Sequence, residues 1–164
     1  MTHRIVVRDA ERNEIDQIAR VWFDSWRDAH EQIVPPELTA ARTLKSLRDR
    51  VAASLDELRV VGEPGKPVGF AMVKDDELYE LFVAAVARGT GVAAALIADA
   101  EERLADYGFR TAWLACAIGN QRAARFYEKQ GWRRVGNMMS RVPITNGEMN
   151  LEVWRYEKDL TYLA

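Results

Sequence analysis

Apolar and polar positions change their spacing several times along this chain of 164 residues, most sharply within Glu80–Tyr107. A short apolar run rich in strand-forming residues ends at Val83. A loop of small residues with two glycines follows. Apolar positions then recur at helical spacing, at Ala93, Ile97, Ala100, Leu104 and Tyr107. The pattern predicts a strand, a glycine loop and a helix that stops at Gly108.

The chain before this centre is expected to form a strand, two helices and two more strands. Ile5–Val7 is the opening strand, and helical spacing runs from Ile15 through Trp26. Pro35 and Pro36 interrupt the helical pattern. The second helix is expected from Thr39 to about Ser54, and the two strands are Leu58–Gly62 and Val68–Val73, paired around a Pro-Gly turn.

After the central helix, the pattern predicts a strand, a helix and two final strands. The strand is Thr111–Ala115, and Gly119 and Asn120 open a helix through Gln130 with Gly131 in the C′ position. The final strands are Trp132–Met139 and Met149–Tyr156, around the loop Pro143–Gly147. Such an order is typical of an α/β protein with a mixed sheet and helices on both faces. No repeat or linker divides the chain, so we expect a single domain over 1–164.

Composition narrows the classes of function. The net charge of −2 gives no electrostatic case for a nucleic-acid partner. No apolar run approaches the roughly 20 residues of a membrane span, and Met1–Arg4 lack the apolar core of a signal peptide. We therefore expect a cytoplasmic protein without nucleic-acid or membrane partners. The single cysteine, Cys116, excludes an internal disulfide, and its apolar neighbours favour a buried strand residue over a catalytic or metal-binding one.

The glycine loop, Arg88–Ala93, has the chemistry of an anion site. The first N–H groups of a helix lack intrahelical partners and carry partial positive charge, which suits phosphate. Gly89 and Gly91 allow close approach, and Arg88 adds a permanent charge. The alternative is a turn that needs glycine for its geometry alone. A Walker loop is excluded because Val92 and Ala93 stand where Lys and Ser/Thr are required, and the glycines lack dinucleotide-fingerprint spacing.

The glycine loop resembles the acyl-CoA loop of the GNAT N-acyltransferase superfamily, Gln/Arg-x-x-Gly-x-Gly/Ala. Leu81-Phe82-Val83 precede it at the family's usual distance, although Ala85 stands where many members have proline. A second segment, Asn120–Trp132, resembles the family's Asn-x-x-Ala-x-x-Phe-Tyr-x-x-x-Gly-Phe/Trp pattern. The order of predicted elements is also similar, so the resemblance covers nearly the whole chain.

The resemblance implies a three-layer α+β fold with a seven-stranded, mostly antiparallel sheet. The fourth and fifth strands, Leu78–Val83 and Thr111–Ala115, would lie parallel and splay apart around the acyl-CoA arm. Acetyl-CoA is the implied acyl donor. The implied donor-binding residues are Phe82, Val83, Arg88, Gly89, Thr90, Gly91, Val92, Ala93, Asn120 and Tyr127. Asn120 can also serve as an N-cap.

Acetyl transfer to an amine needs a proton donor for the leaving thiolate and a general base for the amine. Tyr127 is either a core aromatic or, as the resemblance favours, the proton donor to the leaving CoA thiolate. A general base must free the amine, and Glu80 is the main candidate. Strand alternation puts Glu80 on the same face as Phe82, although a solvated or ion-paired glutamate is the alternative. The other candidate bases are Asp24, Asp28 and His30. A bulge at Phe82–Val83 would free amides to stabilise the carbonyl oxygen.

The acceptor is expected between Trp22–Ile33 and Met138–Glu148. Besides Glu80, the substrate-binding candidates are Trp26 and His30. With Trp154 they would form an aromatic-walled pocket for a cationic amine. The alternative is that these side chains pack in the core or lie on an ordinary surface. The expected function is direct acetyl transfer to a primary amine of a small molecule or peptide in a ternary complex. The alternatives are a longer acyl-CoA donor, a catalytically silent CoA-binding or regulatory module, and an interaction domain without a CoA site. A homodimer through the final strands is expected by analogy.

Overall fold

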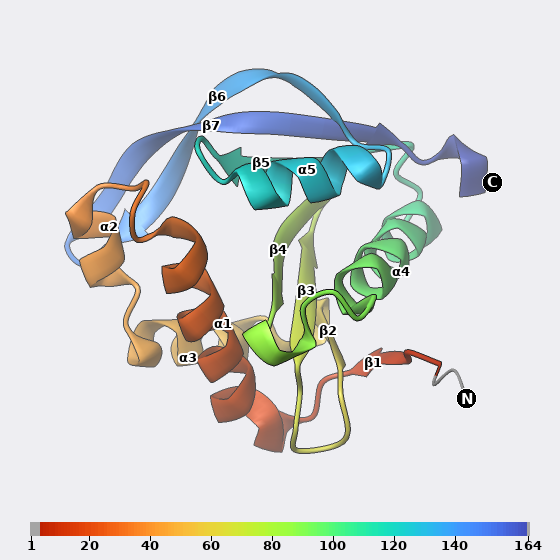
Figure 1. The fold of residues 1–164 in the computed structure, drawn as a ribbon, viewed down its shortest axis with the longest axis horizontal. Coiled ribbons are helices and arrows are strands. Elements are labelled where there is room, and N and C mark those ends of the chain that lie inside the picture. Colours follow the sequence, from red (N-terminus) through yellow and green to blue (C-terminus); the bar gives the residue numbers. More distant parts are fainter. Residues whose placement is uncertain (1–3, 164) are drawn as a thin grey trace.

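The computed structural model describes residues 4–163, so residues 1–3 and 164 of the predicted domain lie outside it. The fold is one seven-stranded sheet in the order β1-β2-β3-β4-β5-β7-β6 (Figure 1). Only β4 and β5 pair in parallel, which confirms the predicted fold class. The strands are β1 (Val7–Asp9), β2 (Leu58–Val61), β3 (Gly69–Lys74), β4 (Glu77–Val83), β5 (Thr111–Ala117), β6 (Arg133–Ile144) and β7 (Gly147–Asp159).

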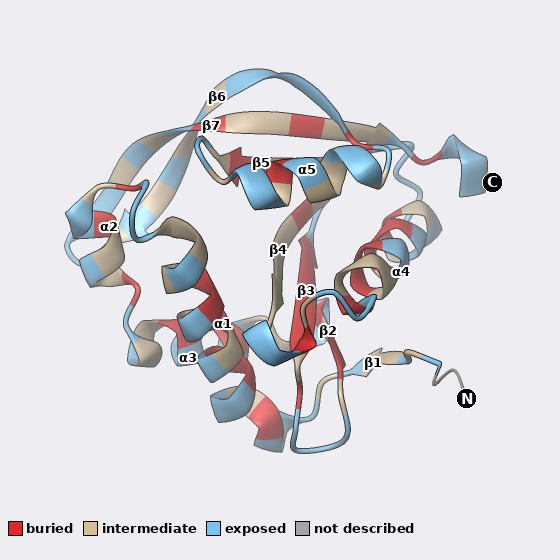
Figure 2. Ribbon diagram, viewed as in Figure 1, coloured by how far each residue is buried: buried red, intermediate tan, exposed pale blue. Residues whose placement is uncertain are grey.

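Within residues 4–163, five α-helices cover the two faces of the sheet, with α1, α2 and α3 on one side and α4 and α5 on the other (Figure 1). Their bounds are α1 (Ile15–His30), α2 (Pro36–Ala41), α3 (Leu44–Ala53), α4 (Val92–Asp106) and α5 (Gln121–Lys129). Buried side chains form stripes along the faces of the helices that meet the sheet (Figure 2). One cluster joins α1 and α3 to the sheet around Trp22 and Phe70, and another joins α4 and α5 around Leu96 and Leu114.

The parallel pair β4–β5 is held at one end only. Its single paired position is Glu77 with Trp113, and Asp76 secures that end by accepting bonds from the Trp113 amide at 3.2 Å and from its indole Nε1 at 2.9 Å. Beyond this point no further pairing between the two strands is present in the described residues. A gap therefore opens toward the ends of β4 and β5, as the resemblance implied.

An irregularity in β4 lies at a different place from the one considered in the sequence. Leu78 pairs with Val73 and Glu80 pairs with Met72, so Tyr79 is an extra residue in this strand. Phe82 and Val83 pair in regular register with β3, and no bulge interrupts them. A bulge turns successive side chains to the same face, and here Tyr79 and Glu80 both face α3.

Three predicted element boundaries are wrong. The first strand is Val7–Asp9 rather than Ile5–Val7, because its pairing with β2 begins at Val7. The expected helix from Thr39 to Ser54 is two helices, since Pro36 starts α2 and the Thr43 side chain caps α3 by accepting a bond from the Ser46 amide at 3.0 Å.

The third concerns the final hairpin, in which the residues predicted as a loop continue both strands. Ile144 pairs with Gly147, which leaves Thr145 and Asn146 as the turn. Pro143 lies within β6, and a proline is tolerated there because β6 is the edge strand of the sheet.

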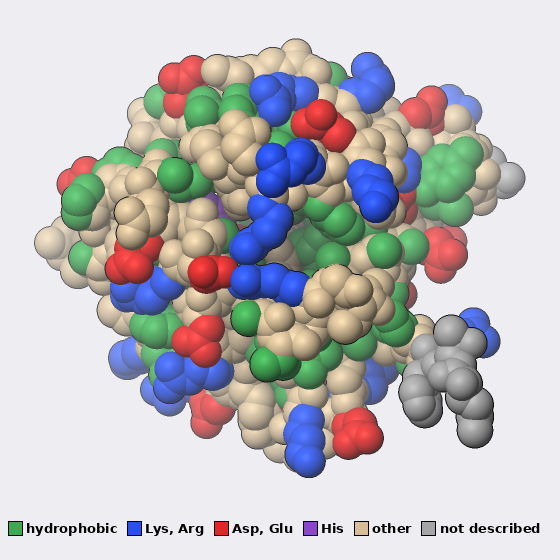
Figure 3. Space-filling model, viewed as in Figure 1, with side chains coloured by type: hydrophobic (Ala, Val, Ile, Leu, Met, Phe, Trp, Pro, Cys, Tyr) green, Lys and Arg blue, Asp and Glu red, His purple; other side chains and the backbone are tan. Residues whose placement is uncertain are grey.

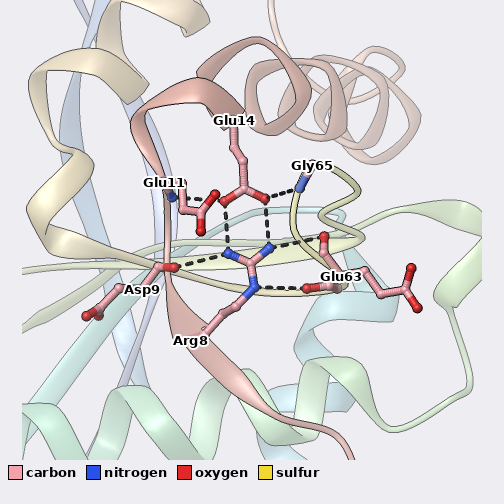
Figure 4. Close-up of polar contacts among 7 residues, drawn as sticks. Arg8, Asp9, Glu11, Glu14, Glu63 and Gly65 are labelled. Atoms are coloured by element: carbon pink, nitrogen blue, oxygen red, sulfur yellow. Dashed lines mark hydrogen bonds and ion pairs between the residues drawn. The ribbon is translucent and has the colours of Figure 1, made fainter.

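A buried carboxylate fixes the start of α1 (Figure 4). Glu14 has no exposed side-chain area and accepts two bonds from Arg8, at 2.7 and 2.9 Å. It also accepts bonds from the Gly65 amide at 3.0 Å and the Glu11 amide at 2.9 Å. The Arg8 bonds hold the pKa of Glu14 at about 2, so the carboxylate stays ionised and ties β1 to the β2–β3 turn.

Two kinds of feature are absent from residues 4–163. None of the helices there has the length and apolar character needed to cross a bilayer. No group of three or more His, Cys, Asp or Glu side chains in the same range is arranged to hold a metal ion.

Candidate active site

A cavity of about 570 Å³ occupies the gap where β4 and β5 part. It is lined by α1, β4, the glycine loop, β5, α5 and the β6–β7 hairpin, and so joins the predicted donor and acceptor sides in one space. On the face drawn in Figure 3, Lys and Arg side chains form a band across the middle of the molecule beside a hollow. This cavity, named the central cavity below, contains most of the predicted site residues.

The glycine loop presents unused backbone donors to the central cavity. None of the N–H groups of residues 89–94 has a hydrogen-bond partner within the described part of the chain. Gly89 has φ of 76°, and a Cβ added there would meet nothing within 4 Å, so the loop is open on that side. Gly91, with φ of 91°, is the N-cap of α4. The loop therefore has the polarity and the space of an anion site.

Eight of the ten predicted donor-binding residues line the central cavity, the exceptions being Thr90 and Val92. The Thr90 hydroxyl donates to the Ala87 carbonyl and Val92 is buried, so these two offer only their amides. Asn120 caps α5 by accepting a bond from the Ala123 amide at 3.3 Å. Arg88 forms an ion pair with Asp28 at 2.6 Å, and Arg122 lies 3.5 Å from the same carboxylate.

The edge of β4 that faces the gap also carries free backbone groups. The Ala84 amide donates to Val68 of the β3 side at 2.8 Å. Hydrogen-bonding direction alternates along an antiparallel pair, so the N–H groups of Leu81 and Val83 face the gap, whereas that of Phe82 faces β3. Phe82 instead places its ring beside Trp22 and His30. The amide of Phe82 is therefore directed away from the gap, whereas the amides of Leu81 and Val83 are free donors at this edge in the described chain.

Tyr127 lies in the central cavity with its ring 5.9 Å from that of Tyr156. Its hydroxyl makes no hydrogen bond to any residue from 4 to 163. Burial, together with Cys116 and Glu80, raises the pKa of Tyr127 well above its usual range. The phenol therefore stays protonated at neutral pH and is a donor without a protein partner.

Two carboxyl groups of β4 line the central cavity. Glu80 lies 3.5 Å from Arg50, and burial raises its pKa above the usual value despite the attraction of that arginine. Glu77 was not singled out in the sequence. Burial and the charge of Glu80 raise the pKa of Glu77 to about 8, so its charge changes close to neutral pH. Its place beside the bulge, which the sequence does not reveal, brings it to the site.

His30 and Trp26, the two substrate-binding candidates of α1, line the central cavity with their ring centroids 5.0 Å apart. Nδ1 of His30 lies 3.0 Å from the Trp26 carbonyl. Burial lowers the pKa of His30 to about 4, so the ring is neutral at pH 7 and is a weak base.

Three other candidates lie elsewhere. Trp154 does not line the central cavity and instead stacks under Arg134 at 3.9 Å, because its side chain faces α5. Asp24 and Asp28 lie on the exposed side of α1, in ion pairs with Arg20 and with Arg88 respectively. Cys116 lines the central cavity, but burial raises the pKa of its thiol to about 12.

A mixed sheet with one splayed parallel pair and an open helix start beside the gap defines the fold of the N-acetyltransferases. The sequence profile of the acetyltransferase (GNAT) family matches residues 15–132. An uncharacterized N-acetyltransferase of Mycobacterium tuberculosis is 35% identical over 114 residues, which are 66% of this chain and 70% of that protein. An uncharacterized N-acetyltransferase of Bacillus subtilis is 28% identical over 142 residues, or 80% and 82% of the two chains.

Solved structures share the fold. A GCN5-related N-acetyltransferase from Rhodopseudomonas palustris has a TM-score of 0.78 at 20% identity and covers 97% of this chain and 98% of its own. The PaiA N-acetyltransferase from Thermoplasma acidophilum, solved with coenzyme A, has a TM-score of 0.71 at 14% identity, with 96% and 99% covered. This chain belongs to the GNAT family of acetyltransferases. It is an N-acetyltransferase that uses acetyl-CoA as its acetyl donor.

Proposed function

We propose that this enzyme, acting as a single domain, transfers the acetyl group of acetyl-CoA directly to a primary amine of a small molecule or peptide in a ternary complex. One observation carries the proposal. A single cavity runs from the unpartnered amides of residues 89–94, past Tyr127, to the carboxyl groups Glu77 and Glu80. Donor and acceptor can therefore meet in one space, which direct transfer requires.

The donor side has the groups that the acyl donor needs. The amides of residues 89–94 and the guanidinium of Arg88 suit a diphosphate. The free N–H groups of Leu81 and Val83 suit the carbonyl oxygens of the pantetheine arm and of the thioester. Asn120 keeps its side-chain N–H groups available because its cap uses only the oxygen. These contacts would place the thioester carbon in the gap between β4 and β5.

Tyr127 and Glu80 take the two proton-handling roles. The acceptor ammonium loses two protons as the C–N bond forms and the C–S bond breaks. The leaving sulfur gains one proton, so the net reaction releases one proton to solvent. Glu80 accepts from nitrogen, either directly or through a water molecule. The phenol of Tyr127 has a raised pKa, so it acts chiefly as a hydrogen-bond donor that stabilises charge on the leaving sulfur, and the released thiolate takes its proton from solvent.

Cys116 supports direct transfer by its chemistry. A thiol with a pKa of about 12 is protonated at neutral pH, and the thiolate is the nucleophilic form. Within residues 4–163 the thiol hydrogen-bonds only to the backbone carbonyls of Ala117 and Asn120, at 3.8 and 3.9 Å. An acetylated cysteine is therefore no part of the proposal, and Cys116→Ala is expected to keep its activity.

The test is CoA release from acetyl-CoA in the presence of a panel of primary amines, combined with mass spectrometry of the acetylated product. Turnover that requires an amine supports the proposal. Thermal stabilisation by CoA without turnover would instead show a silent CoA-binding module, and no stabilisation would show an interaction domain. Faster turnover with longer acyl-CoA thioesters would reassign the donor.

We also propose a homodimer formed along β6. This strand is the free edge of the sheet, and it exposes 44% of Val135 and 56% of Met139. Unpaired edge strands are ready templates for pairing with a second chain. Light scattering on the purified protein should give twice the mass of one chain, and Val135→Lys with Met139→Lys should lower it. A wild-type monomer at micromolar concentration contradicts this proposal.

A further inference from the structure

Arg42 is a buried cation at the acceptor end of the central cavity. Only 7% of its surface is exposed, and its Nη1 donates to the Pro143 carbonyl at 2.8 Å. No carboxylate among residues 4–163 lies within ion-pair distance of its guanidinium. Removing a charge from water is costly unless an opposite charge compensates it. Four of its five N–H groups have no hydrogen-bond partner within residues 4–163, and the side chain lines the cavity.

The position of Arg42 results from the break between two helices. It follows the last residue of α2, and Thr43 then caps α3, so the chain turns at this point. The turn directs the Arg42 side chain toward Trp26, with its guanidinium carbon 5.8 Å from that ring. Pro143 of β6 fixes it from the other side. The guanidinium is thus held in place on two sides while it lines the cavity.

The charges around Arg42 leave this end of the cavity positive. Arg50 lines the cavity nearby, and the pKa of Arg42 is lowered first by burial and then by the charge of Arg50. Glu80 is ion-paired with Arg50 at 3.5 Å and can compensate one of the two cations. Glu77 is mostly neutral at pH 7, because its pKa is about 8. One positive charge remains without a counter-charge.

We propose that the acetyl acceptor is a small amino acid with a free carboxylate, which Arg42 binds while the amino group lies at Glu80. The inference rests on the proposed function and names its substrate class. A guanidinium binds a carboxylate through two parallel bonds, which orients the molecule as well as holding it. The amine is then directed away from the arginines, toward the carboxyl groups of β4 and the gap that holds the thioester.

This assignment disfavours two other acceptor classes. A polyamine or another purely cationic amine would place positive charge beside Arg42. Its attraction to the aromatic rings of Trp26 and His30 is weaker than its repulsion by the arginine. A protein N-terminus has its carboxyl group converted to a peptide bond, so it would leave Arg42 buried and unpaired.

The experiment compares matched acceptors. CoA release is measured with free α-amino acids and with the same compounds as carboxamides, which keep the amine and the side chain but lose the negative charge. An amino-acid amide has the more easily deprotonated amine, so intrinsic reactivity favours it. We expect kcat/KM to be about 100-fold higher for the free acids, mainly through KM, since a site built for a charged partner rejects the analogue that lacks it.

The variants test Arg42 itself. Arg42→Gln should reduce the acid-to-amide ratio of kcat/KM to near 1, and Arg42→Lys should keep part of it. The matched control is Arg48→Gln, on the exposed side of α3 in an ion pair with Asp16, which should leave the ratio unchanged. A purely structural role for Arg42 would lower the melting temperature of both variants without changing the ratio, and would overturn the inference.

The outcomes separate the two proposals. Equal or faster turnover of amides, polyamines or peptides overturns the amino-acid inference but leaves amine acetylation standing. The absence of turnover with every amine, although acetyl-CoA still raises the melting temperature, defeats the proposed function and the inference with it. If Arg42→Gln does not fold, the substrate comparison in wild type and Arg42→Lys decides.

Discussion

At the scale of single residues, the central cavity contains polar side chains with few partners in the described chain. Elsewhere a buried charge such as Glu14 has four bonds to Arg8 and two amides. In the cavity, the Tyr127 hydroxyl has no partner within the described chain, and Arg42 has one. Native proteins leave few buried polar groups unpaired, so these are the groups that ligands are expected to satisfy.

The carboxyl pair of β4 predicts a pH dependence of activity. The pKa of Glu77 is raised to about 8, so the group is neutral at pH 7 and ionises as the pH rises through 8. We expect kcat/KM to rise across this range in the wild type. In Glu80→Gln the inflection should move to lower pH, because the charge of Glu80 is one cause of the raised pKa, and the rate should fall about 100-fold.

Glu77→Gln is the companion variant, which keeps only the neutral form, so it should remove the inflection near pH 8 and hold kcat/KM at the level that the wild type has below it. A raised pKa also means that the folded state holds this proton more tightly than the unfolded chain does. Stability is therefore lost as pH rises from the usual glutamate value to about 8. Glu77→Gln should be more stable than wild type at pH 9, and equal pH profiles of rate and of melting temperature in the two proteins would contradict the assignment.

The role of Tyr127 predicts an effect on kcat. In Tyr127→Phe the ring still fills its place beside Tyr156, and only the hydroxyl is lost. With both substrates saturating, kcat should fall about 100-fold, and KM for acetyl-CoA should change little. Tyr156→Phe is the control, since its hydroxyl is bonded to Glu128 and Arg134 outside the cavity. An unchanged kcat in Tyr127→Phe rules out the role.

At the scale of elements, the predictable and unpredictable parts of the site separate clearly. Helix periodicity and glycine placement predicted α4, its open N-terminus and the cap of α5 by Asn120, because these depend on residues close in sequence. The bulge at Tyr79 depends on pairing with β3, and it brought Glu77 to the cavity unpredicted. Arg42 was missed because Thr43 appeared to continue a helix rather than to cap a new one.

The glycine loop predicts a matched pair of substitutions. Gly89 has φ of 76° and open space around a would-be Cβ, and Gly65 in the β2–β3 turn has φ of 80° and equally open space. Alanine at either position costs roughly 1 kcal/mol of stability through backbone strain. Only Gly89→Ala should also raise KM for acetyl-CoA, by about tenfold or more, because its methyl group blocks the approach to the amides.

Denaturant unfolding measures the loss of stability in both variants, and initial-rate kinetics measure their KM for acetyl-CoA. Gly65→Ala lies far from the cavity and is expected to keep the wild-type KM. Equal KM values in the two variants would mean that the glycine serves the turn alone, which is the alternative considered from the sequence.

At the scale of the whole molecule, the central cavity lies between two separate hydrophobic clusters. One joins α4 and α5 to the sheet and carries the donor loop, and the other joins α1 and α3 and carries the acceptor side. The seven-stranded sheet and its splayed parallel pair were predictable by resemblance, whereas the contacts across the cavity were not, because they join segments far apart in sequence. Asp28 of α1 is such a contact, since it binds Arg88 of the loop and Arg122 of α5.

The position of Asp28 between α1 and the donor loop predicts an effect of its charge on CoA binding. Its carboxylate lies at 2.6 Å from Arg88 and 3.5 Å from Arg122, and these guanidinium groups hold the pKa of Asp28 below its usual range. At neutral pH it therefore places a negative charge beside the proposed diphosphate site. Asp28→Asn should tighten CoA binding by about three- to tenfold at low salt, and less at high salt, because exposed charges are screened.

Calorimetric titration of CoA at two salt concentrations makes the measurement. Asp24→Asn is the matched control, because Asp24 lies one turn earlier on α1 and pairs with Arg20 outside the cavity. Weaker binding in Asp28→Asn would mean that Asp28 instead holds Arg88 and Arg122 in the orientation that CoA needs. Since the same carboxylate joins α1 to the donor loop, the sign of the change shows whether the ion pairs compete with the donor or prepare its site.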